Sequence, residues 1–210
     1  MIAQFGVSKG TVREAMRILE AQGLIVTKTG PGGGSSVGEV SKDRAMSLLG
    51  NYFYFKDLSI SDIYQIRKVL EPELVATLAG QLDGETLAEL REMAHQHPNP
   101  AKTPEEEKQQ HITSLAFHAR IADAAENELL GFVISFMARI LTDLTVYRRL
   151  YAAPNKELWE RGRRHQIDLV DALERGDGPR ARDIMRSHME GAESMMNAQE
   201  IRITREFMEE

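Results

Sequence analysis

From residue 43 to its C-terminus the chain carries apolar residues at helical spacing and no credible strand. Helices are predicted at about 43–54, 60–80, 84–94, 104–124, 127–150, 156–175 and 178–203. The clearest break is Gly176-Asp177-Gly178-Pro179, because glycine ends a helix and proline suits the first turn of the next. The pattern therefore predicts a mainly α protein whose larger part is an antiparallel all-helical bundle of six or seven helices.

Residues 1–42 have a different pattern. Ser8 is a good N-cap for a helix over 8–22, in which four apolar side chains recur at the spacing of one buried stripe: Val12, Ala15, Met16 and Leu19. Two strands, 24–26 and 35–37, are predicted to form a hairpin around the glycine-rich turn 30–34. A flexible linker is the alternative for this turn when it is judged alone. We therefore expect two domains, 1–42 and 43–210.

The composition, with 42% hydrophobic and 28% charged residues, is that of a soluble globular chain. No apolar run approaches the roughly 20 residues of a membrane span, and the N-terminus lacks the features of a signal peptide. We therefore expect a cytoplasmic protein without a membrane partner. Because the chain has no cysteine, a metal could be held only by histidine, carboxylate or water.

Charge is distributed unevenly along the chain. The net charge is -6, yet residues 1–42 hold five cationic and three acidic side chains, so the body is strongly acidic. Lys9, Arg13 and Arg17 follow one another at i, i+4 and i+8, which places them on one face of the first predicted helix. Such a face can contact phosphates, although the spacing alone favours a solvated amphipathic helix.

The stretch FGVSKGTVREAMRILEAQGLIVTKTGPGGGSSV, residues 5–37, resembles the winged helix-turn-helix of the GntR superfamily of bacterial transcription regulators. The resemblance implies that helix 8–22 enters the major groove and that the glycine-rich turn is the wing tip over the minor groove. The residues that it places at the DNA are Ser8, Lys9, Gly10, Thr11, Arg13, Gly30 and Gly32. Members of the superfamily begin with a further helix, whereas this chain opens at Ile2 inside what would be the second helix, so the domain is expected to be N-terminally incomplete.

Three histidines are placed unusually for solvent-exposed residues. His118, His165 and His188 each share a predicted helical face with apolar side chains, so all three are expected to point into the bundle. A single buried histidine is usually a hydrogen-bonded core residue. Three of them on separate helices favour a divalent metal, and neutral imidazoles suit Zn or Ni.

The body resembles the helical, FCD-type effector-binding domain of the FadR-like branch of the same superfamily. The resemblance rests on DIYQIR at 62–67 with LEP at 70–72, on FH at 117–118 with EN at 126–127, and on His165 with ALERGD at 172–177 leading to His188. The family arrangement completes the three histidines with an aspartate four residues before the first of them. Here that position is Ser114, a weak neutral ligand, so water or the effector's own carboxylate is expected to replace it.

The other histidines have simpler expectations. His111 lies one heptad before His118 on the same face and could substitute for the missing ligand, although exposure at a helix turn is the simpler expectation. His95 and His97 fall in a proline-rich loop and are expected to be solvated.

Arg67 lies on an apolar face of its predicted helix, so its guanidinium is expected inside the bundle, where it needs an anion. The anion is either an internal carboxylate such as Glu71 or the carboxylate of a small organic acid, and the family resemblance favours the acid. Ser114 and Tyr147 are further candidates for lining this effector site.

These features together predict a ligand-responsive, DNA-binding transcription regulator rather than an enzyme. Its helical domain is expected to bind a small carboxylate, with a divalent metal, and to alter two DNA-binding heads in a homodimer. Two alternatives stay open: an effector-binding and dimerisation protein whose truncated N-terminus leaves it without DNA binding, and a less favoured histidine-metal hydrolase. Against the hydrolase, no carboxylate is placed as an obvious general base.

Overall fold

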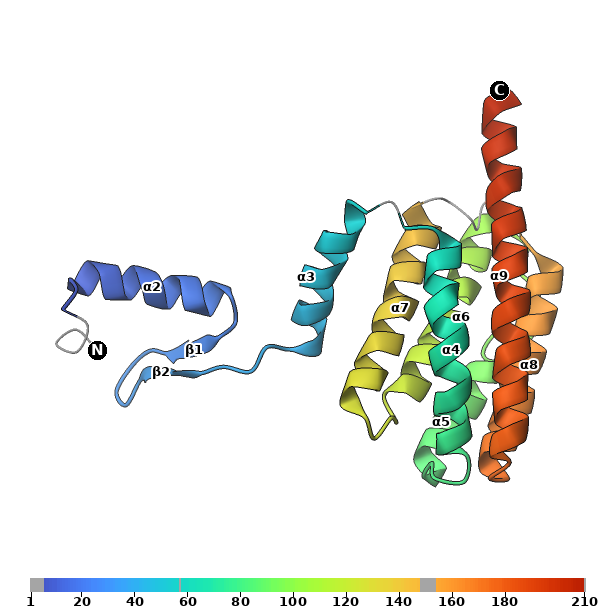
Figure 1. Cartoon of the computed structure of the whole chain (residues 1–210), viewed down its shortest axis with the longest axis horizontal. Coiled ribbons are helices and arrows are strands. Elements are labelled where there is room, and N and C mark those ends of the chain that lie inside the picture. Colours follow the sequence, from blue (N-terminus) through green and yellow to red (C-terminus); the bar gives the residue numbers. More distant parts are fainter. Residues whose placement is uncertain (1–5, 57, 148–153, 210) are drawn as a thin grey trace. The chain divides into compact units, whose positions relative to one another are not determined.

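The structure is a computed structural model that describes residues 6–56, 58–147 and 154–209. The chain divides into two compact units, residues 1–55 and 56–210 (Figure 1). The elements of the first unit are α2 (Lys9–Ala21), β1 (Ile25–Lys28), β2 (Gly34–Val37) and α3 (Lys42–Tyr54). Those of the second are α4 (Ile60–Leu78), α5 (Gly84–His95), α6 (Pro104–Ala122), α7 (Glu128–Tyr147), α8 (Lys156–Glu174) and α9 (Gly178–Glu209). The predicted mainly α architecture is therefore confirmed, with six described helices in the second unit.

The division between the units lies after Phe55, later than the expected boundary between residues 42 and 43. Helix α3 groups with the first unit, where a Cβ on Gly23 would stand only 3.1 Å from Cδ of Arg44. The side chain of Arg44 thus packs against the turn that ends α2. Whether the two units carry separate functions, as the sequence predicts, stays a prediction.

The first unit is built on α2 and a two-stranded hairpin. Ser8 caps α2, as predicted, because its Oγ accepts the backbone N–H of Thr11 at 3.2 Å. Gly23, at φ +76°, closes the helix and turns the chain into β1. The strands pair antiparallel, with Ile25 opposite Val37 at one end of the ladder.

The apolar stripe of α2 is less buried than the sequence predicts. None of the side chains of α2 is buried among the described residues, and Val12, Met16 and Leu19 are only half-buried, while Ala15 is exposed. The element that packs against α2 is β1, and a hairpin of two four-residue strands is too small to cover the stripe. The side of α2 that the spacing predicts to be apolar and covered is therefore only half-buried in this part of the chain.

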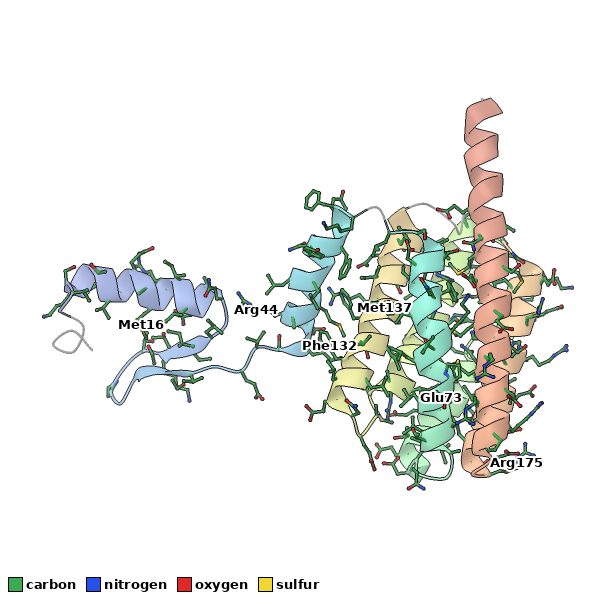
Figure 2. The ribbon with its side chains drawn as sticks, in the orientation of Figure 1. Met16, Arg44, Glu73, Phe132, Met137 and Arg175 are labelled. Atoms are coloured by element: carbon green, nitrogen blue, oxygen red, sulfur yellow. The ribbon has the colours of Figure 1, made fainter. Side chains whose placement is uncertain are left out.

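The second unit is a helical bundle whose long helices run side by side (Figure 1). Helix α4 packs against α9 and α7, α6 packs against α7 and α5, and α8 packs against α9 and α5. Its core consists mostly of aliphatic side chains and methionines, among them Ile60, Ile63, Val75, Leu90, Ile121, Leu141, Leu173, Met185 and Met189. Ion pairs on the surface join the same helices, for example Arg182 of α9 to Glu73 of α4 at 2.8 Å. Figure 2 shows Glu73 on α4.

Two glycines allow the end of α4 to approach the turn between α8 and α9. Gly80 and Gly176 both have positive φ, +75° and +71°, and a Cβ on Gly80 would lie 3.2 Å from Cα of Gly176. The backbone N–H of Gly80 donates to the carbonyl of Leu173 at 2.8 Å. The break predicted at 176–179 is therefore also the place where the C-terminal end of α4 contacts the turn between α8 and α9.

Helix α7 corrects the expectation that no apolar run is long enough to cross a membrane. Residues Glu128–Val146 are long and apolar enough by length and composition, although one such helix is weak evidence because a core helix passes the same test. Ile134, Ala138 and Leu141 are buried, and α7 packs against α6 and α4. Its hydrophobicity is explained by its place in the bundle.

Candidate functional site

The N-terminal end of α2 presents polar and cationic side chains to solvent. Ser8, Lys9, Thr11 and Arg13 are all exposed, as is Gly10, so the structure leaves this predicted DNA-contacting set open. Arg17 is exposed as well, with Nη1 3.7 Å from Oε2 of Glu14, a separation at which a surface ion pair contributes little. The cations predicted to share one face are thus available for phosphate contacts.

The hairpin turn requires glycine. Gly30 and Gly32 have φ of +105° and +78°, which L side chains rarely adopt, and both are exposed at the tip. A Cβ on Gly33 would lie 2.3 Å from the carbonyl oxygen of Lys28. At its base the hairpin is held to α2, because the N–H of Thr27 donates to Oε1 of Glu20 at 3.2 Å. The tip can therefore lie close to another surface while its base stays fixed.

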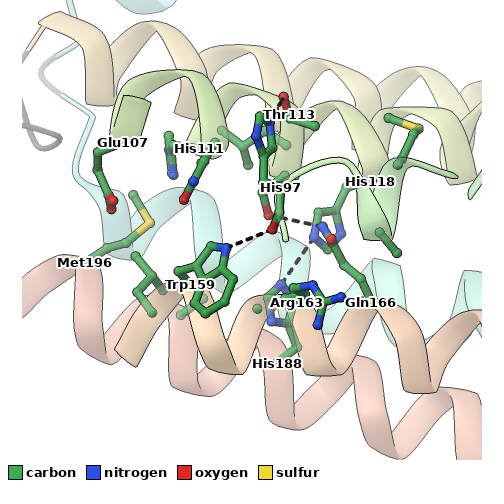
Figure 3. Close-up of a pocket in the computed structure, with 18 of the residues that line it drawn as sticks. His97, Glu107, His111, Thr113, His118, Trp159, Arg163, Gln166, His188 and Met196 are labelled. Atoms are coloured by element: carbon green, nitrogen blue, oxygen red, sulfur yellow. Dashed lines mark hydrogen bonds between the residues drawn. The ribbon is translucent and has the colours of Figure 1, made fainter. Parts of the chain in front are cut away.

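The second unit contains a cavity of about 90 Å³ between α4, α5, α6, α8 and α9 (Figure 3). Among the described residues, five buried side-chain polar atoms have no hydrogen-bond partner, and four of these belong to residues that line the cavity: Arg67 Nη2, Gln110 Oε1, His111 Nε2 and Arg163 Nε. Buried polar groups are normally paired, since leaving one unpaired costs about 1–3 kcal/mol. This concentration marks the cavity as a place for a polar ligand.

Arg67 is almost fully buried, as predicted, and its guanidinium is only partly paired. Its Nε donates to Glu71, whose other oxygen accepts from Nδ1 of His118 at 2.7 Å. Burial would raise the pKa of Glu71, but Arg67 and His118 outweigh it and lower that pKa to about 2. The internal partner expected as one alternative is therefore present, while Nη2 is buried without a partner among the described residues in a side chain that lines the cavity.

His118 and His188 come together as the metal prediction requires. An ionised carboxylate can only accept, so Nδ1 of His118 carries its hydrogen and Nε2 points to His188, with the two Nε2 atoms 3.2 Å apart. Two imidazoles on one tetrahedral zinc, with Zn–N of about 2.0–2.1 Å, have their nitrogens about 3.3 Å apart. A carboxylate behind a histidine is also the usual outer partner of a metal ligand.

His165 lies beside this pair but does not complete a three-histidine metal-binding group with it. Its ring centroid is 5.1 Å from that of His188, and its Nδ1 donates to the carbonyl of Arg161 at 2.6 Å, which leaves Nε2 as the atom able to bind a metal. In the part of the chain that the structure describes, no three His, Asp or Glu side chains form a metal-binding group as they stand. A metal at all three histidines therefore stays a prediction.

Ser114 lines the cavity but is occupied, because its Oγ accepts from Nε2 of the buried Gln166 at 3.2 Å. Tyr147 is the last residue of α7, and its side chain lies outside the described residues.

Burial lowers the pKa of His188 well below its usual value, and the nearby charges of His118, His165 and Arg67 act in the same direction. His188 is therefore neutral near pH 7, because its protonation is unfavourable at this end of the cavity.

Two histidine expectations were wrong. His111 is not exposed: its Nε2 is buried, and burial together with Arg67 lowers its pKa to about 4. His97 is not solvated either, since its Nε2 lies 3.2 Å from Oγ1 of Thr113 and its carbonyl accepts from Nε1 of Trp159 at 3.2 Å (Figure 3). The proline-rich loop folds back over the cavity because Trp159 and Thr113 hold it there. His95, by contrast, ends α5 and is exposed as expected.

Sequence reasoning missed several lining residues. Arg163, Gln166 and Trp159 all lie on α8, one face of which contributes to the cavity, and Glu107 lies on α6. Glu107 could have been found, because residues 107, 111, 114 and 118 recur at heptad-like spacing and form a polar stripe on the inner face of α6. No local signal identifies Trp159, since its role depends on a loop about 60 residues earlier in the chain.

Comparison with known proteins agrees with this geometry. One family model, the FCD domain, matches residues 62–191, more than half of the chain, and a second, bacterial regulatory proteins of the gntR family, matches residues 1–34. The chain belongs to the FCD-domain regulators of the GntR family. The resemblance seen in the sequence is thereby confirmed, and these families are transcription regulators, not enzymes.

Relatives of this regulator have been described in several bacteria. It is 25% identical over 194 residues to the HTH-type transcriptional regulator LutR of Bacillus subtilis, covering 92% of this chain and 86% of LutR. It is 27% identical over 175 residues to the Glc operon transcriptional activator of Escherichia coli K12, covering 80% of this chain and 65% of that protein.

Solved structures share the fold of this regulator. Streptococcus agalactiae GntR superposes with a TM-score of 0.63 at 17% identity, over 92% of this chain and 85% of that chain. E. coli McbR/YncC superposes with a TM-score of 0.51 at 22% identity, over 94% and 84% of the respective chains. At these identities the likeness extends to the fold alone.

Proposed function

We propose that this cytoplasmic regulator controls transcription in response to a small organic acid. The helical unit binds the acid, with a divalent metal, and the first unit binds operator DNA as one half of a homodimer. Coupling follows if the acid has different affinities for the DNA-binding and the free arrangement of the dimer. On the DNA side, the proposal assigns contacts to Ser8, Lys9, Gly10, Thr11, Arg13, Gly30 and Gly32.

The observation that carries the proposal is a pair of unpaired donors on two arginines that line the cavity. Nη2 of Arg67 and Nε of Arg163 are buried and have no partner among the described residues. A carboxylate offers two acceptor oxygens and a negative charge, and hydrogen bonds between charged groups contribute roughly twice as much as neutral ones. An acid bound here would therefore satisfy two donors that the protein leaves unsatisfied.

The metal part of the proposal rests on the facing Nε2 atoms of His118 and His188 and on His165, whose Nδ1 donates to the carbonyl of Arg161 and so leaves Nε2 as its acceptor atom. Zn or Ni held there would supply a positive charge and an open coordination position. Ser114 brings no charge to the site, so the carboxylate of the acid is suited to that position. Glu71 would orient His118 from behind.

A thermal-shift screen of small mono- and dicarboxylates tests the acid site. We expect at least one acid to raise the melting temperature of the wild type in proportion to the logarithm of its concentration. Arg163→Gln and His165→Ala should abolish the shift, whereas the exposed His95→Ala should retain it. A best ligand without any carboxylate, or a shift that survives Arg163→Gln, would contradict the proposal.

Metal analysis of the purified protein tests the second part. We expect divalent metal in the wild type and stronger retention against a chelator in Ser114→Asp, because a carboxylate is a better ligand than a hydroxyl. If both proteins are free of metal after loading with Zn or Ni, the three histidines are core residues only.

A further inference from the structure

The end of the cavity away from the histidine pair has the opposite chemistry. Glu107, Gln110 and His111 stand on one turn of α6 at i, i+3 and i+4, and all three line the cavity. Figure 3 shows Glu107 and His111 at one end and His118, Arg163 and Gln166 at the other. The two ends therefore differ in what they can bind.

Each of the three side chains offers an acceptor. Oε1 of Gln110 is buried without a partner among the described residues, while its Nε2 donates to the carbonyl of Asn99 at 2.9 Å. Burial and the charge of Arg67 lower the pKa of His111 to about 4, so it is neutral near pH 7 and one of its two ring nitrogens is an acceptor. Its buried Nε2 has no partner among the described residues and is that acceptor when Nδ1 carries the hydrogen. Glu107 is only 8% exposed and accepts from the backbone of Asn155, which leaves lone pairs on a carboxylate with room for several donors.

Three acceptors on one helical turn match a primary ammonium group, which has three N–H donors and no acceptor. A cation beside Glu107 would in turn offset much of the free-energy cost of burying its ionised carboxylate. A hydroxyl supplies only one donor for the three acceptors. A second carboxylate supplies none and would place two anions side by side.

The two ends are close enough for one small molecule. Arg67 and His111 line the same cavity, from α4 and α6, and each has a buried side-chain nitrogen without a partner among the described residues. Glu107 stands one turn further along α6, roughly 6 Å beyond His111 at about 1.5 Å of rise per residue.

We propose that the effector is a small amino acid of about four carbons, with its carboxylate at Arg67 and Arg163 and its ammonium at Glu107, Gln110 and His111. This inference rests on the proposed acid site and adds the recognition of a cation at the opposite end. Glu107 is then the residue that distinguishes the effector from a simple carboxylic acid.

Isothermal titration with four acids of equal chain length tests the inference: 4-aminobutyrate, 4-hydroxybutyrate, butyrate and succinate. On the wild type we expect 4-aminobutyrate to bind at least about tenfold more tightly than butyrate, and succinate to bind most weakly. Glu107→Gln keeps the shape of the side chain and removes its charge, so it should reduce the preference for 4-aminobutyrate over butyrate to within about threefold. The matched control is Glu105→Gln, the same change at a side chain 80% exposed, which should leave the preference intact.

The outcomes separate the two claims. If the acids bind but 4-aminobutyrate has no advantage, or if its advantage survives Glu107→Gln, the inference is overturned and the acid site remains. If 4-hydroxybutyrate binds as tightly as 4-aminobutyrate, the far group is a hydroxyl and the ammonium is wrong. If none of the four binds, the acid site itself fails and the inference fails with it.

Discussion

The two candidate binding regions of this regulator are built in opposite ways. The residues proposed to contact DNA lie within one stretch of some 25 residues, on an exposed helix end and a glycine turn. The cavity takes its residues from five helices between Tyr64 and Met196, and its polar atoms are buried. A surface of the first kind can be changed without disturbing the fold, whereas the second kind is part of the core. This difference predicts how mutations divide between stability and binding.

Arg67→Ala should have the largest effect on stability. It leaves the buried carboxylate of Glu71 beside His118 without its guanidinium, and breaking a buried ion pair from one side costs about 3–5 kcal/mol. Denaturant unfolding of the full chain measures this cost. Arg13→Ala removes an exposed guanidinium and should change the free energy of unfolding by less than about 0.5 kcal/mol. Equal costs at the two positions would show that the cavity is not a structural site.

Acid should weaken the helical unit before it affects the exposed surface of α2. The pKa of His111 falls from 6.5 to about 4 on burial, so the unfolded chain takes up a proton in a pH range where the folded chain does not. The free energy of unfolding should therefore decrease between pH 7 and pH 5, by on the order of 1–3 kcal/mol.

Denaturant titrations at pH 7 and pH 5 measure this dependence. His111→Phe should reduce this dependence, and the remainder is due to His188, whose pKa burial also lowers. His95→Phe at an exposed position should leave the dependence unchanged. Burial raises the pKa of Glu107, which works in the opposite direction and makes the net loss smaller. Unchanged stability across this range in the wild type would mean that His111 is solvated after all.

Arg13→Ala should affect DNA binding instead of stability. If the side chain reads a base edge or clamps a phosphate, its loss should weaken binding by on the order of 1–3 kcal/mol. Fluorescence anisotropy with a duplex selected from a random pool by the wild type measures this loss. Arg175→Ala is the control, because Arg175 is also an exposed cation and lies at the C-cap of α8. Wild-type affinity in Arg13→Ala would remove α2 from the interface.

The smallest effect is expected in the wing. Gly33→Ala brings a Cβ to within 2.3 Å of the carbonyl of Lys28, so the hairpin tip must shift, whereas Gly34→Ala meets nothing within 4 Å. Gly33→Ala should weaken DNA binding by about 1 kcal/mol relative to Gly34→Ala if the tip contacts the minor groove. Identical affinities of the two variants would show that the wing does not contact DNA.

The same difference explains what could be predicted from the sequence. The helices, the hairpin and the cap at Ser8 were predicted within a few residues, because capping and periodicity are local. The inward position of Arg67 and the pairing of His118 with His188 also followed from helical faces. The helical face of a residue determines whether its side chain points inward, but it does not determine which groups that side chain contacts.

What could not be predicted depends on distant parts of the chain. His97 was expected in solvent, yet Trp159 and Thr113 fix its loop over the cavity. Helical periodicity placed Arg67 inside but could not tell that Nε would pair with Glu71 and Nη2 would stay unpaired. Likewise, the rotation of the His165 ring is set by a hydrogen bond to Arg161, which spacing does not reveal.

The central claim, that the cavity is the effector site, can be tested through the single tryptophan of the chain. Trp159 lines the cavity, so its fluorescence reports occupancy without a label. Titrating the wild type with the acid that gives the largest thermal shift should change the Trp159 emission saturably, at the concentrations that stabilise the protein. Arg163→Gln should lose both responses together, and His95→Ala should keep both. Thermal stabilisation by an acid with no change in Trp159 emission would place the effector elsewhere and contradict the account.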